Sequence, residues 1–508
     1  MDLSTVEKIY HQDYRTVPIM NSTFIITGKC SLTCKYCFER GMPASKRKDM
    51  SSQVAIQGME FLFENSKHIL EDRQISIMLF GGEPTLNPKT IISLINHYKN
   101  HMRPKYPNRR FSMSIITNCC QLSDELYNCF LENAQLINLS CQVSIDGMPE
   151  IQDLNRIQPN GKGSSHLIPD TLNKWKHIFK HDPKRLNVHG CCSPDTISYL
   201  YENYCYFKDV YGISQIWFLP VPELDWKPEH VKIYDEQMNK IYHDVLNDVK
   251  KTGDVNQAFC YAPLDRFISC NFPDKPCGAG TDYCTITQDG DLFPCHQLYF
   301  CDNEKETCMG NIWNGVDDDK RRIFLEYDCS DLTCPTSCDH GACYRCFASN
   351  YQSRGSMLSQ VRGYYCAFMK IDQKYERMLK EELLKMGLLN GENMGNYSNC
   401  LCDSRGDQNV CHSDCGGECH GECGNENCKN NENCKDGCHD CHCGSEDHYI
   451  KSQWQNKVCN SEFEIDTFTD EQGNEITIKR RKKQTNIDEA IDILSQAFNE
   501  VIRLLQQR

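Results

Sequence analysis

The sequence predicts an α/β protein: a parallel sheet, covered by helices on its outer side and curved into a partial barrel of six strand and helix units. Up to about residue 220, short apolar runs alternate with amphipathic stretches such as SQVAIQGMEFLFENSKHIL, in which apolar residues recur at helical spacing. Two later segments lack this pattern. Residues 256–370 are dense in Cys, Gly and Pro, and residues 399–447 contain almost no large apolar side chain.

Six apolar runs are the predicted strands of the sheet. In chain order they are TFIIT (23–27), ISIMLF (75–80), FSMSIIT (111–117), CQVSI (141–145), LNVHG (186–190) and IWFLP (216–220). Parallel sheets of this kind bind their ligands at the C-terminal ends of the strands. Several motifs follow directly after these runs, so we expect one functional site at that edge of the sheet.

Length and composition narrow the class of protein. The chain has 508 residues, more than one ordinary core accommodates, and 35 of them are cysteines. Its first 20 residues are polar and charged, and it has no apolar run long enough to cross a bilayer, so we expect a cytoplasmic protein without a membrane partner. Cytoplasmic cysteines stay reduced and serve first as metal ligands or catalytic groups. The net charge of −15 argues against a nucleic-acid partner, because phosphates would be repelled.

We expect six segments along the chain. They are an N-terminal segment (1–20), the partial barrel (21–255), a Cys-rich metal-binding domain (256–370), a helix and linker (371–398), a Cys-rich low-complexity tract (399–447), and a hairpin followed by an amphipathic helix (448–508). The Cys-rich domain cannot form a conventional core, so metal clusters are expected to hold it together. The hairpin turns at QGN, and Asn486 and Glu489 stand in capping-box register at the start of the last helix.

The first cysteine motif is GKCSLTCKYCFE, which places Cys30, Cys34 and Cys37 in the loop after the first strand. Three thiolates at this spacing can hold three irons of a [4Fe-4S] cluster and leave the fourth iron open for another ligand. An aromatic residue, Tyr36, precedes the third cysteine. Half of a zinc site, or unliganded surface thiols, is the alternative interpretation of the same three cysteines.

A second motif, FGGEP (80–84), follows the next strand. With the cysteine motif one strand and helix upstream, it resembles the radical S-adenosylmethionine (SAM) enzymes. The resemblance implies that the open iron is chelated by the amino and carboxylate groups of SAM, which is cleaved to a 5′-deoxyadenosyl radical. It also implies that the FGGEP turn binds the SAM amino group, because its glycines let backbone carbonyls approach closely and Glu83 adds charge.

Two further segments resemble motifs of the same family. In VSIDG the resemblance implies that Ser144 and Asp146 face the SAM ribose and the substrate, and in QDLNR it implies that Arg156 pairs with the SAM carboxylate. Gln152 stands where a histidine is frequent, and ITNC stands where TNG is usual. The implied cofactor-binding residues are therefore Tyr36, Gly81, Gly82, Glu83, Asn118, Ser144, Asp146 and Arg156. No residue of the sequence is assigned as the catalytic group that acts on the substrate.

The Cys-rich middle resembles the SPASM extension of these enzymes, which implies two auxiliary [4Fe-4S] clusters. By analogy, Cys277, Cys284, Cys295 and Cys346 hold one cluster, and Cys334, Cys338, Cys343 and Cys366 hold the other. The inner spacing reads C-x3-C-x4-C-x2-C instead of the usual C-x2-C-x5-C-x3-C, so Cys301, Cys308 and Cys329 remain as substitute ligands. Zinc sites are the alternative for this domain. Cysteines without a motif, among them Cys119, Cys120 and Cys191, are expected to be small buried residues.

The low-complexity tract bears on the substrate. Within CHSDCGGECHGECGNENC a cysteine stands at every fourth position from Cys411 to Cys423, and an acidic residue follows each of them three positions later. This pattern resembles the Cys-x-x-x repeat peptides that certain maturases of the family target. It implies thioether formation between sulfur and carbon in a Cys-rich ribosomally made peptide, with the tract as substrate or mimic. A metal-binding tail is the alternative, because cysteines and histidines are good soft ligands.

Two other functions stay open at this point. One is formylglycine formation on a protein partner, as in the anaerobic sulfatase maturases of the family. The other is a metal-binding iron-sulfur protein without SAM chemistry, which an assay for SAM cleavage separates from the rest. For an enzyme of this family the resemblance also implies an electron donor such as flavodoxin or ferredoxin.

Overall fold

The computed structural model describes residues 18–39, 41–68, 73–255, 277–301, 304–326, 346–357, 364–388, 463–469 and 475–481. The chain divides into two compact units, Met1–Gly395 and Asn396–Arg508. Every predicted site residue that the structure describes lies in the first unit.

The first unit is built on an eight-stranded sheet with the strand order β6-β5-β4-β3-β2-β1-β7-β8. Neighbours from β6 to β7 are parallel, and only β8 runs antiparallel to its neighbour β7. The strands are β1 (Asn21–Ile25), β2 (Gln74–Phe80), β3 (Arg110–Thr117), β4 (Ser140–Ser144), β5 (Leu186–Cys192), β6 (Gln215–Pro220), β7 (Tyr283–Ile286) and β8 (Leu292–Phe293). The six predicted strands are β1 to β6, so the predicted parallel sheet is confirmed.

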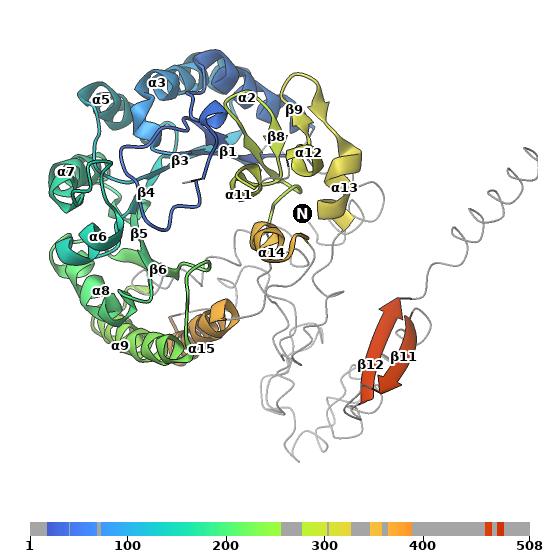
Figure 1. Ribbon diagram of the computed structural model, residues 1–508. Helices are drawn as coiled ribbons and strands as arrows, with labels where there is room; N and C mark the ends of the chain where they lie inside the picture. Colours follow the sequence, from blue (N-terminus) through green and yellow to red (C-terminus); the bar gives the residue numbers. More distant parts are fainter. Residues whose placement is uncertain are drawn as a thin grey trace, which may run out of the picture. The chain divides into compact units, whose positions relative to one another are not determined.

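Helices lie around the outer side of the curved sheet, as Figure 1 shows for the arc from α2 to α9. They are α2 (Ser52–Asn65), α3 (Pro88–His97), α5 (Asp124–Asn133), α6 (Pro149–Asn155), α7 (Ile168–Ile178), α8 (Leu200–Asp209) and α9 (Pro228–Thr252). The Ser51 side chain accepts a hydrogen bond from the Val54 backbone and so begins α2 at the predicted place. A fold of alternating strands and outer helices, open between its two edge strands, is the predicted partial barrel.

The strands alternate between buried and half-buried side chains. In β3, for example, Phe111, Met113 and Ile115 are buried, whereas the residues between them are more exposed. The buried side chains join those of the helices in one apolar core cluster, which includes Phe24, Ile77, Val143, Val188 and Trp175. Packing against the helices therefore fixes one face of the sheet, and the segments that follow the strands can hold the functional residues.

The Cys-rich segment is attached to this barrel. It supplies β7 and β8, which extend the sheet beyond β1, and short helices that include α11 (His296–Tyr299), α12 (Glu304–Thr307), α13 (Asp318–Glu326) and α14 (Phe347–Arg354). A long helix, α15 (Tyr364–Lys385), covers the predicted helix and packs on α9, where the Tyr234 hydroxyl donates to Asp372 at 2.7 Å. These contacts make residues 277–388, as far as the structure describes them, part of the same unit.

The second unit contains a hairpin of β11 (Phe463–Thr469) and β12 (Glu475–Arg481), paired antiparallel with Phe463 opposite Arg481. The two predicted strands are therefore confirmed. The Cys-rich tract, the QGN turn and the final helix, with Asn486 and Glu489, lie outside the described residues.

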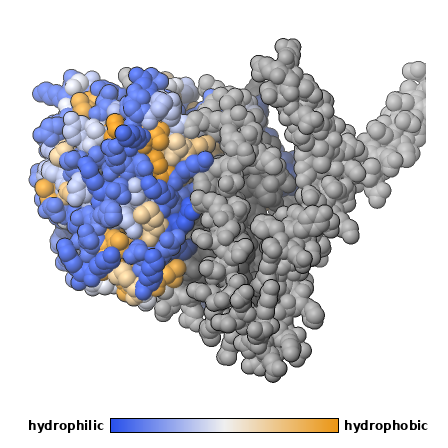
Figure 2. Space-filling model, turned by 90° about the horizontal axis from the view of Figure 1, so that it is seen from below, coloured by the Kyte–Doolittle hydropathy of each residue, from blue (hydrophilic) through white to orange (hydrophobic). Residues whose placement is uncertain are grey.

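The surface seen in Figure 2 is mostly hydrophilic over the coloured residues, with small scattered hydrophobic patches. Large exposed apolar side chains in the described residues include Val210 and Trp313. No helix within the described ranges combines the length and the apolar character that crossing a bilayer requires.

Candidate active site

The loop that carries Cys30, Cys34 and Cys37 is fixed by backbone hydrogen bonds to the segment after α6. The Thr33 amide donates to the Ile157 carbonyl at 2.7 Å, and the Lys35 amide donates to the Asn155 carbonyl at 3.0 Å. Protein contacts alone thus hold the backbone between the cysteines in place. The loop follows β1 directly, at the expected C-terminal edge of the sheet.

The thiols of this loop suit a metal cluster. Burial raises the pKa of Cys30 to about 12 and that of Cys37 to about 11, and it also raises the pKa of Cys34. Without a cation these thiols stay protonated, whereas a bound metal deprotonates them. In the described part of the chain no three Cys, His, Asp or Glu side chains are arranged for a single metal ion. A [4Fe-4S] cluster differs, because each cysteine binds a separate iron.

The two glycines of FGGEP let the turn after β2 lie directly on this loop. Gly81 has a φ of +99°, and a Cβ there would stand 2.4 Å from the Thr27 carbonyl oxygen. A Cβ on Gly82 would stand 2.1 Å from the Lys29 carbonyl oxygen. Only glycine fits at either position, because both close neighbours are backbone atoms.

Glu83 lies in the turn after β2, an inner strand of the sheet, and is fully buried. Its Oε1 accepts hydrogen bonds from the Thr85 amide (3.1 Å), the Thr85 hydroxyl (2.7 Å) and the Thr117 hydroxyl (2.8 Å). Its Oε2 accepts one from the Asn118 amide at 2.7 Å. Burial raises the pKa of this carboxyl group. Oε2 accepts only one of these four hydrogen bonds, so it keeps acceptor capacity for a further donor such as an ammonium group.

Asp146, two residues beyond β4, collects three donors from three other segments. The Arg156 Nε donates to its Oδ1 at 2.8 Å, the Cys191 amide donates to the same oxygen at 3.0 Å, and the Tyr36 hydroxyl donates to its Oδ2. The Arg156 guanidinium also lies 5.5 Å from the centre of the Tyr36 ring. Four segments of the chain thus converge on one buried carboxylate.

Arg156 is held as a buried cation. Burial by itself lowers the pKa of the guanidinium, but Asp146 and Tyr36 raise it above its usual range, with a smaller contribution from Cys34. The charge of Arg156 in turn lowers the pKa of the Cys34 thiol, against the larger effect of burial. The structure therefore brings Arg156 between the cluster loop and Asp146, with Ser144 half-buried at the end of β4 nearby in sequence.

The sequence did not reveal the role of Gln152, whose side chain binds the backbone of Asp146. The Asp146 amide donates to Gln152 Oε1 at 2.8 Å, and Gln152 Nε2 donates to the Ser164 hydroxyl at 3.0 Å. Gln152 and Arg156 are four residues apart, a spacing that places both on one side of a helical turn and could have indicated the shared partner. Cys191 was also missed, because its contact with Asp146 uses only a backbone amide.

Part of the predicted auxiliary set comes together. The Cys295 thiol interacts electrostatically with Cys346 and Cys277, and the pKa of Cys295 is raised mainly by burial. Cys284 is not part of this group, because it lies on the other face of β7 from Tyr283, and its thiol contacts the Ser22 hydroxyl at 3.5 Å. Cys366 is half-buried on α15. The remaining predicted ligands, Cys334, Cys338 and Cys343, lie outside the described residues, as does Cys329.

The thiols of the substitute ligands Cys301 and Cys308 each donate a hydrogen bond to a nearby backbone carbonyl. Cys301 donates to the Gln297 carbonyl at 3.3 Å, and Cys308 donates to the Gly310 carbonyl at 3.5 Å. Both contacts are made within four residues along the chain, so neither thiol joins the group around Cys295 through them.

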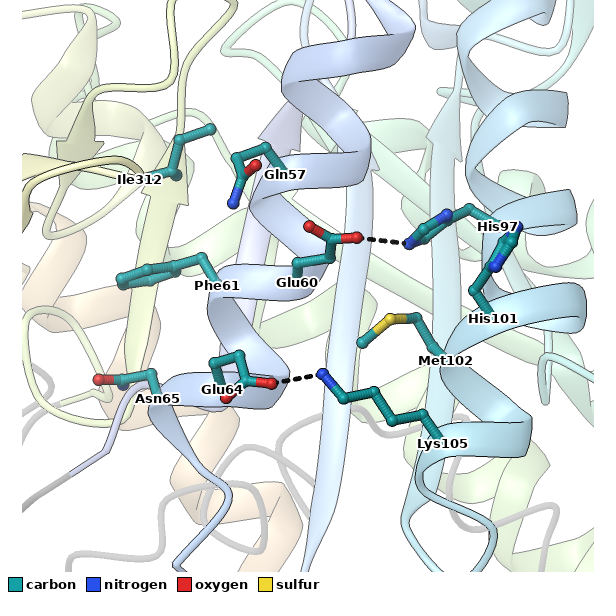
Figure 3. A pocket seen from close by; sticks show the side chains of 10 residues that line it. All are labelled: Gln57, Glu60, Phe61, Glu64, Asn65, His97, His101, Met102, Lys105 and Ile312. Carbon is teal, nitrogen blue, oxygen red and sulfur yellow. Dashed lines mark hydrogen bonds and ion pairs between the residues drawn. The ribbon is translucent and has the colours of Figure 1, made fainter.

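A cavity of about 540 Å³ lies on the outer helices and includes none of these residues. Figure 3 shows Glu60 of α2 directed toward His97 (3.1 Å) and Glu64 directed toward Lys105 (2.6 Å). The lining residues are Gln57, Glu60, Phe61, Glu64, Asn65, His97, His101, Met102, Lys105 and Ile312. This cavity is distinct in composition from the site at the strand ends.

Comparisons with known proteins agree with this site. A family model described as a 4Fe-4S single cluster domain matches residues 21–168. The chain is 26% identical over 303 residues to an uncharacterized protein of Methanocaldococcus jannaschii, a match that covers 59% of this chain and 89% of that protein. It is 25% identical over 287 residues to the radical SAM cyclopropyl synthase TigE of Paramaledivibacter caminithermalis, covering 53% of this chain and 56% of TigE.

A third relative and a solved structure extend the comparison. The chain is 25% identical over 293 residues to the cysteine-type anaerobic sulfatase-maturating enzyme of Clostridium novyi, covering 55% of this chain and 73% of that enzyme. The fold is similar to that of anSMEcpe with bound AdoMet and Cp18Cys peptide, with a TM-score of 0.54, 19% identity, and coverage of 73% of this chain and 100% of that chain.

The fold and the site together define the class of protein. A partial parallel barrel carries three cysteines in the loop after β1, a Gly-Gly-Glu turn after β2 and a buried arginine and aspartate after β4. In sequence, the chain is similar to radical SAM enzymes such as TigE. The matching 4Fe-4S family model and the cysteine loop support a [4Fe-4S] cluster, and the similarity to radical SAM enzymes supports SAM as the second cofactor.

Proposed function

We propose that this enzyme is a peptide maturase that forms thioether crosslinks between cysteine sulfur and carbon in a Cys-rich peptide. The observation that carries the proposal is the repeat from Cys411 to Cys423, in which each cysteine precedes an acidic residue by three positions. The peptide bound in the anSMEcpe structure supports a peptide as the class of substrate. TigE is a radical SAM cyclopropyl synthase, and the similarity of the chain to TigE supports a reaction that forms a bond at carbon.

The reaction removes two hydrogens from the peptide. When bound, SAM and the cluster supply a 5′-deoxyadenosyl radical, which takes one hydrogen atom from carbon and leaves as 5′-deoxyadenosine. The S–H bond would break and the C–S bond would form, the thiol proton would go to solvent, and the remaining electron would need an acceptor, which an auxiliary cluster held by the Cys-rich segment would supply. The acidic residue, or a backbone carbon next to it, supplies the carbon partner in this proposal.

The residues of the site have separate parts in the proposal. Cys30, Cys34 and Cys37 hold the cluster, and the Gly81–Gly82 turn with Glu83 Oε2 accepts the SAM ammonium group. Arg156 holds the SAM carboxylate with the guanidinium nitrogens that Asp146 leaves available, since only its Nε is bound to Asp146. Tyr36, Asn118 and Ser144 complete the walls around the cofactor.

The Cys-rich segment has a role in electron transfer in the same proposal. Cys277, Cys295 and Cys346 hold one auxiliary cluster, and Cys334, Cys338, Cys343 and Cys366 hold the other. Cys284, which faces the core, is replaced at the first cluster by another ligand. A flavodoxin or ferredoxin supplies the electron that starts each turnover.

Tandem mass spectrometry of the tract tests the function directly. After anaerobic reconstitution with SAM and reductant, each Cys-acid pair should lose two hydrogens. Cys30→Ala should abolish the loss, whereas Cys129→Ala, which changes a half-buried cysteine of α5, should leave it intact. An unmodified tract together with 5′-deoxyadenosine production would refute the tract as substrate, and a separate Cys-x-x-x peptide would be assayed next.

A second candidate function is formylglycine formation on a protein partner. The relative from Clostridium novyi, which is a cysteine-type anaerobic sulfatase-maturating enzyme, favours it. The test is incubation with a short synthetic peptide of the sulfatase type that contains one cysteine. Conversion of that cysteine to formylglycine, without crosslinks in a Cys-x-x-x peptide, would establish this candidate over thioether formation.

A further inference from the structure

We propose that Asn118 tunes the reduction potential of the [4Fe-4S] cluster by donating a hydrogen bond from its side-chain amide to the sulfur of Cys30. The proposal rests on the cluster bound at Cys30, Cys34 and Cys37, and not on the identity of the substrate. It assigns a redox role to a residue that the motif comparison associates only with cofactor binding.

The geometry places the amide at the cluster loop. Asn118 follows β3 directly and is buried, with 7% of its surface exposed. Its Nδ2 lies 3.8 Å from Cys30 Sγ and 3.1 Å from the Ser31 hydroxyl oxygen. Hydrogen bonds to sulfur are longer than those to oxygen because the sulfur atom is larger, so both contacts are within bonding range.

The orientation of the amide is fixed by its other end. Asn118 Oδ1 accepts a hydrogen bond from the Cys120 amide at 2.9 Å, and a backbone N–H can only donate. This contact assigns the oxygen side of the amide and therefore directs the NH₂ group toward Cys30. The Asn118 backbone is held as well, because its amide donates to Glu83 Oε2 at 2.7 Å.

The physical effect follows from charge. A reduced cluster carries one more electron than an oxidised one, and part of that charge resides on its cysteine sulfurs. A donor N–H aimed at such a sulfur stabilises the reduced form and raises the reduction potential. The Leu32 backbone amide also donates to Cys30 Sγ, at 3.4 Å, but Asn118 provides the contact that a side-chain substitution removes.

The test is a redox titration monitored by electron paramagnetic resonance of the cluster whose spectrum changes when SAM is added. Asn118→Ala should lower the midpoint potential at unchanged iron content. Thr33→Val is the matched control, because Thr33 lies in the same loop and its hydroxyl donates to the carbonyls of Ile157 and Gln158 and not to sulfur. Its potential should equal that of the wild type. Equal potentials in all three proteins would overturn the proposal.

A measurement on the wild type covers the case in which Asn118→Ala does not fold. With asparagine side-chain amides labelled with ¹⁵N, electron-nuclear double resonance of the reduced cluster should show a weak ¹⁵N coupling, and its absence would refute the contact. Cys30→Ala tests the underlying site separately. If that variant retains the SAM-responsive signal at full intensity, the cluster assignment fails, whatever the role of Asn118.

Discussion

Asp146 and Glu83 show how single buried carboxylates organise this site. Asp146 accepts hydrogen bonds from three other segments, and Glu83 accepts them from Thr85 and from the end of β3, so each carboxylate joins parts of the chain that follow different strands. The two carboxylates differ in their hydrogen-bond donors: Asp146 is paired with the cation Arg156, whereas Glu83 accepts hydrogen bonds from uncharged groups. Loss of the Asp146 carboxylate should therefore leave Arg156 as an unpaired buried charge.

Asp146→Ala should destabilise the protein strongly. Its partner Arg156 would remain buried as an uncompensated cation, which costs about 3 to 5 kcal/mol. Urea unfolding monitored by circular dichroism measures this change. The control is Asp124→Ala, which removes an ion pair to Lys174 at 2.6 Å whose carboxylate is 86% exposed, and it should leave the midpoint unchanged. Similar midpoints for both variants would contradict the structural role of Asp146.

Cys119 occupies the position where the family motif usually has glycine. Its φ of +60° lies in the left-handed region, which costs an L-residue about 1 kcal/mol. Cys119→Gly should have nearly unchanged stability, because relief of this strain offsets the loss of a small buried side chain. Cys119→Val should be less stable than both, since a branched Cβ is more restricted there. Thermal unfolding of the three proteins checks this order, and a stable valine variant would contradict it.

At the scale of elements, the site exists because parallel strands end at one edge. Gly81 follows β2, Asn118 follows β3, and Asp146 follows β4, so residues dozens of positions apart meet around the loop after β1. The turn after β2 approaches this loop most closely, through the contact of Gly82 with the Lys29 carbonyl.

Gly82→Ala should reduce cluster binding without unfolding the barrel. The new Cβ would collide with the Lys29 carbonyl and push the turn away from the cysteine loop. Gly41→Ala is the matched control, because a Cβ at Gly41 meets no atom within 4 Å. Iron content per chain after reconstitution should fall severalfold in the first variant only. Full iron content in Gly82→Ala would show that the close approach is not needed.

Removal of the cluster should leave its loop ordered. The Thr33 and Lys35 amides bond to carbonyls of the protein and not to the metal site, so they should remain protected from hydrogen exchange after iron is chelated. Exchange measured with and without iron checks this expectation. A rise to the rate of an unstructured segment would mean that the cluster, and not the contacts with residues 155–157, orders the loop.

At the scale of the whole molecule, the catalytic machinery and the Cys-rich tract belong to different units. The sheet, the cysteine loop and helices α9 and α15 lie within Met1–Gly395, whereas the tract lies within Asn396–Arg508. The match to the uncharacterized protein of Methanocaldococcus jannaschii covers 89% of that protein and 59% of this chain.

A chain ending at Gly395 should therefore fold, bind iron and cleave SAM at a rate similar to that of the full chain. It should also modify the separate tract peptide when that peptide is added, if the tract is a substrate. Measurement of 5′-deoxyadenosine formation tests the first expectation, and mass spectrometry tests the second. Loss of SAM cleavage would show that the second unit contributes to the site.

Much of the fold was predictable, because local patterns in this chain agree with the final structure. The six apolar runs became β1 to β6, and the hairpin strands formed as expected. The strands β7 and β8 were not predicted, because their short apolar segments lie among Cys, Gly and Pro residues that indicate irregular structure. Their place beside β1 depends on pairing across more than 250 residues.

By itself, the sequence determined the α/β sheet and the resemblance of its motifs to those of radical SAM enzymes, because cysteine spacing, glycines and strand periodicity are local properties. Only the tertiary structure decided how these residues share partners. Arg156 bonds to Asp146, Gln152 holds that aspartate, and Asn118 points its amide at Cys30. The Cys284 thiol is buried in the core against Ser22 and does not face Cys295. Such pairings arise where strand ends converge, and their distances depend on packing of the whole sheet, which no local pattern records.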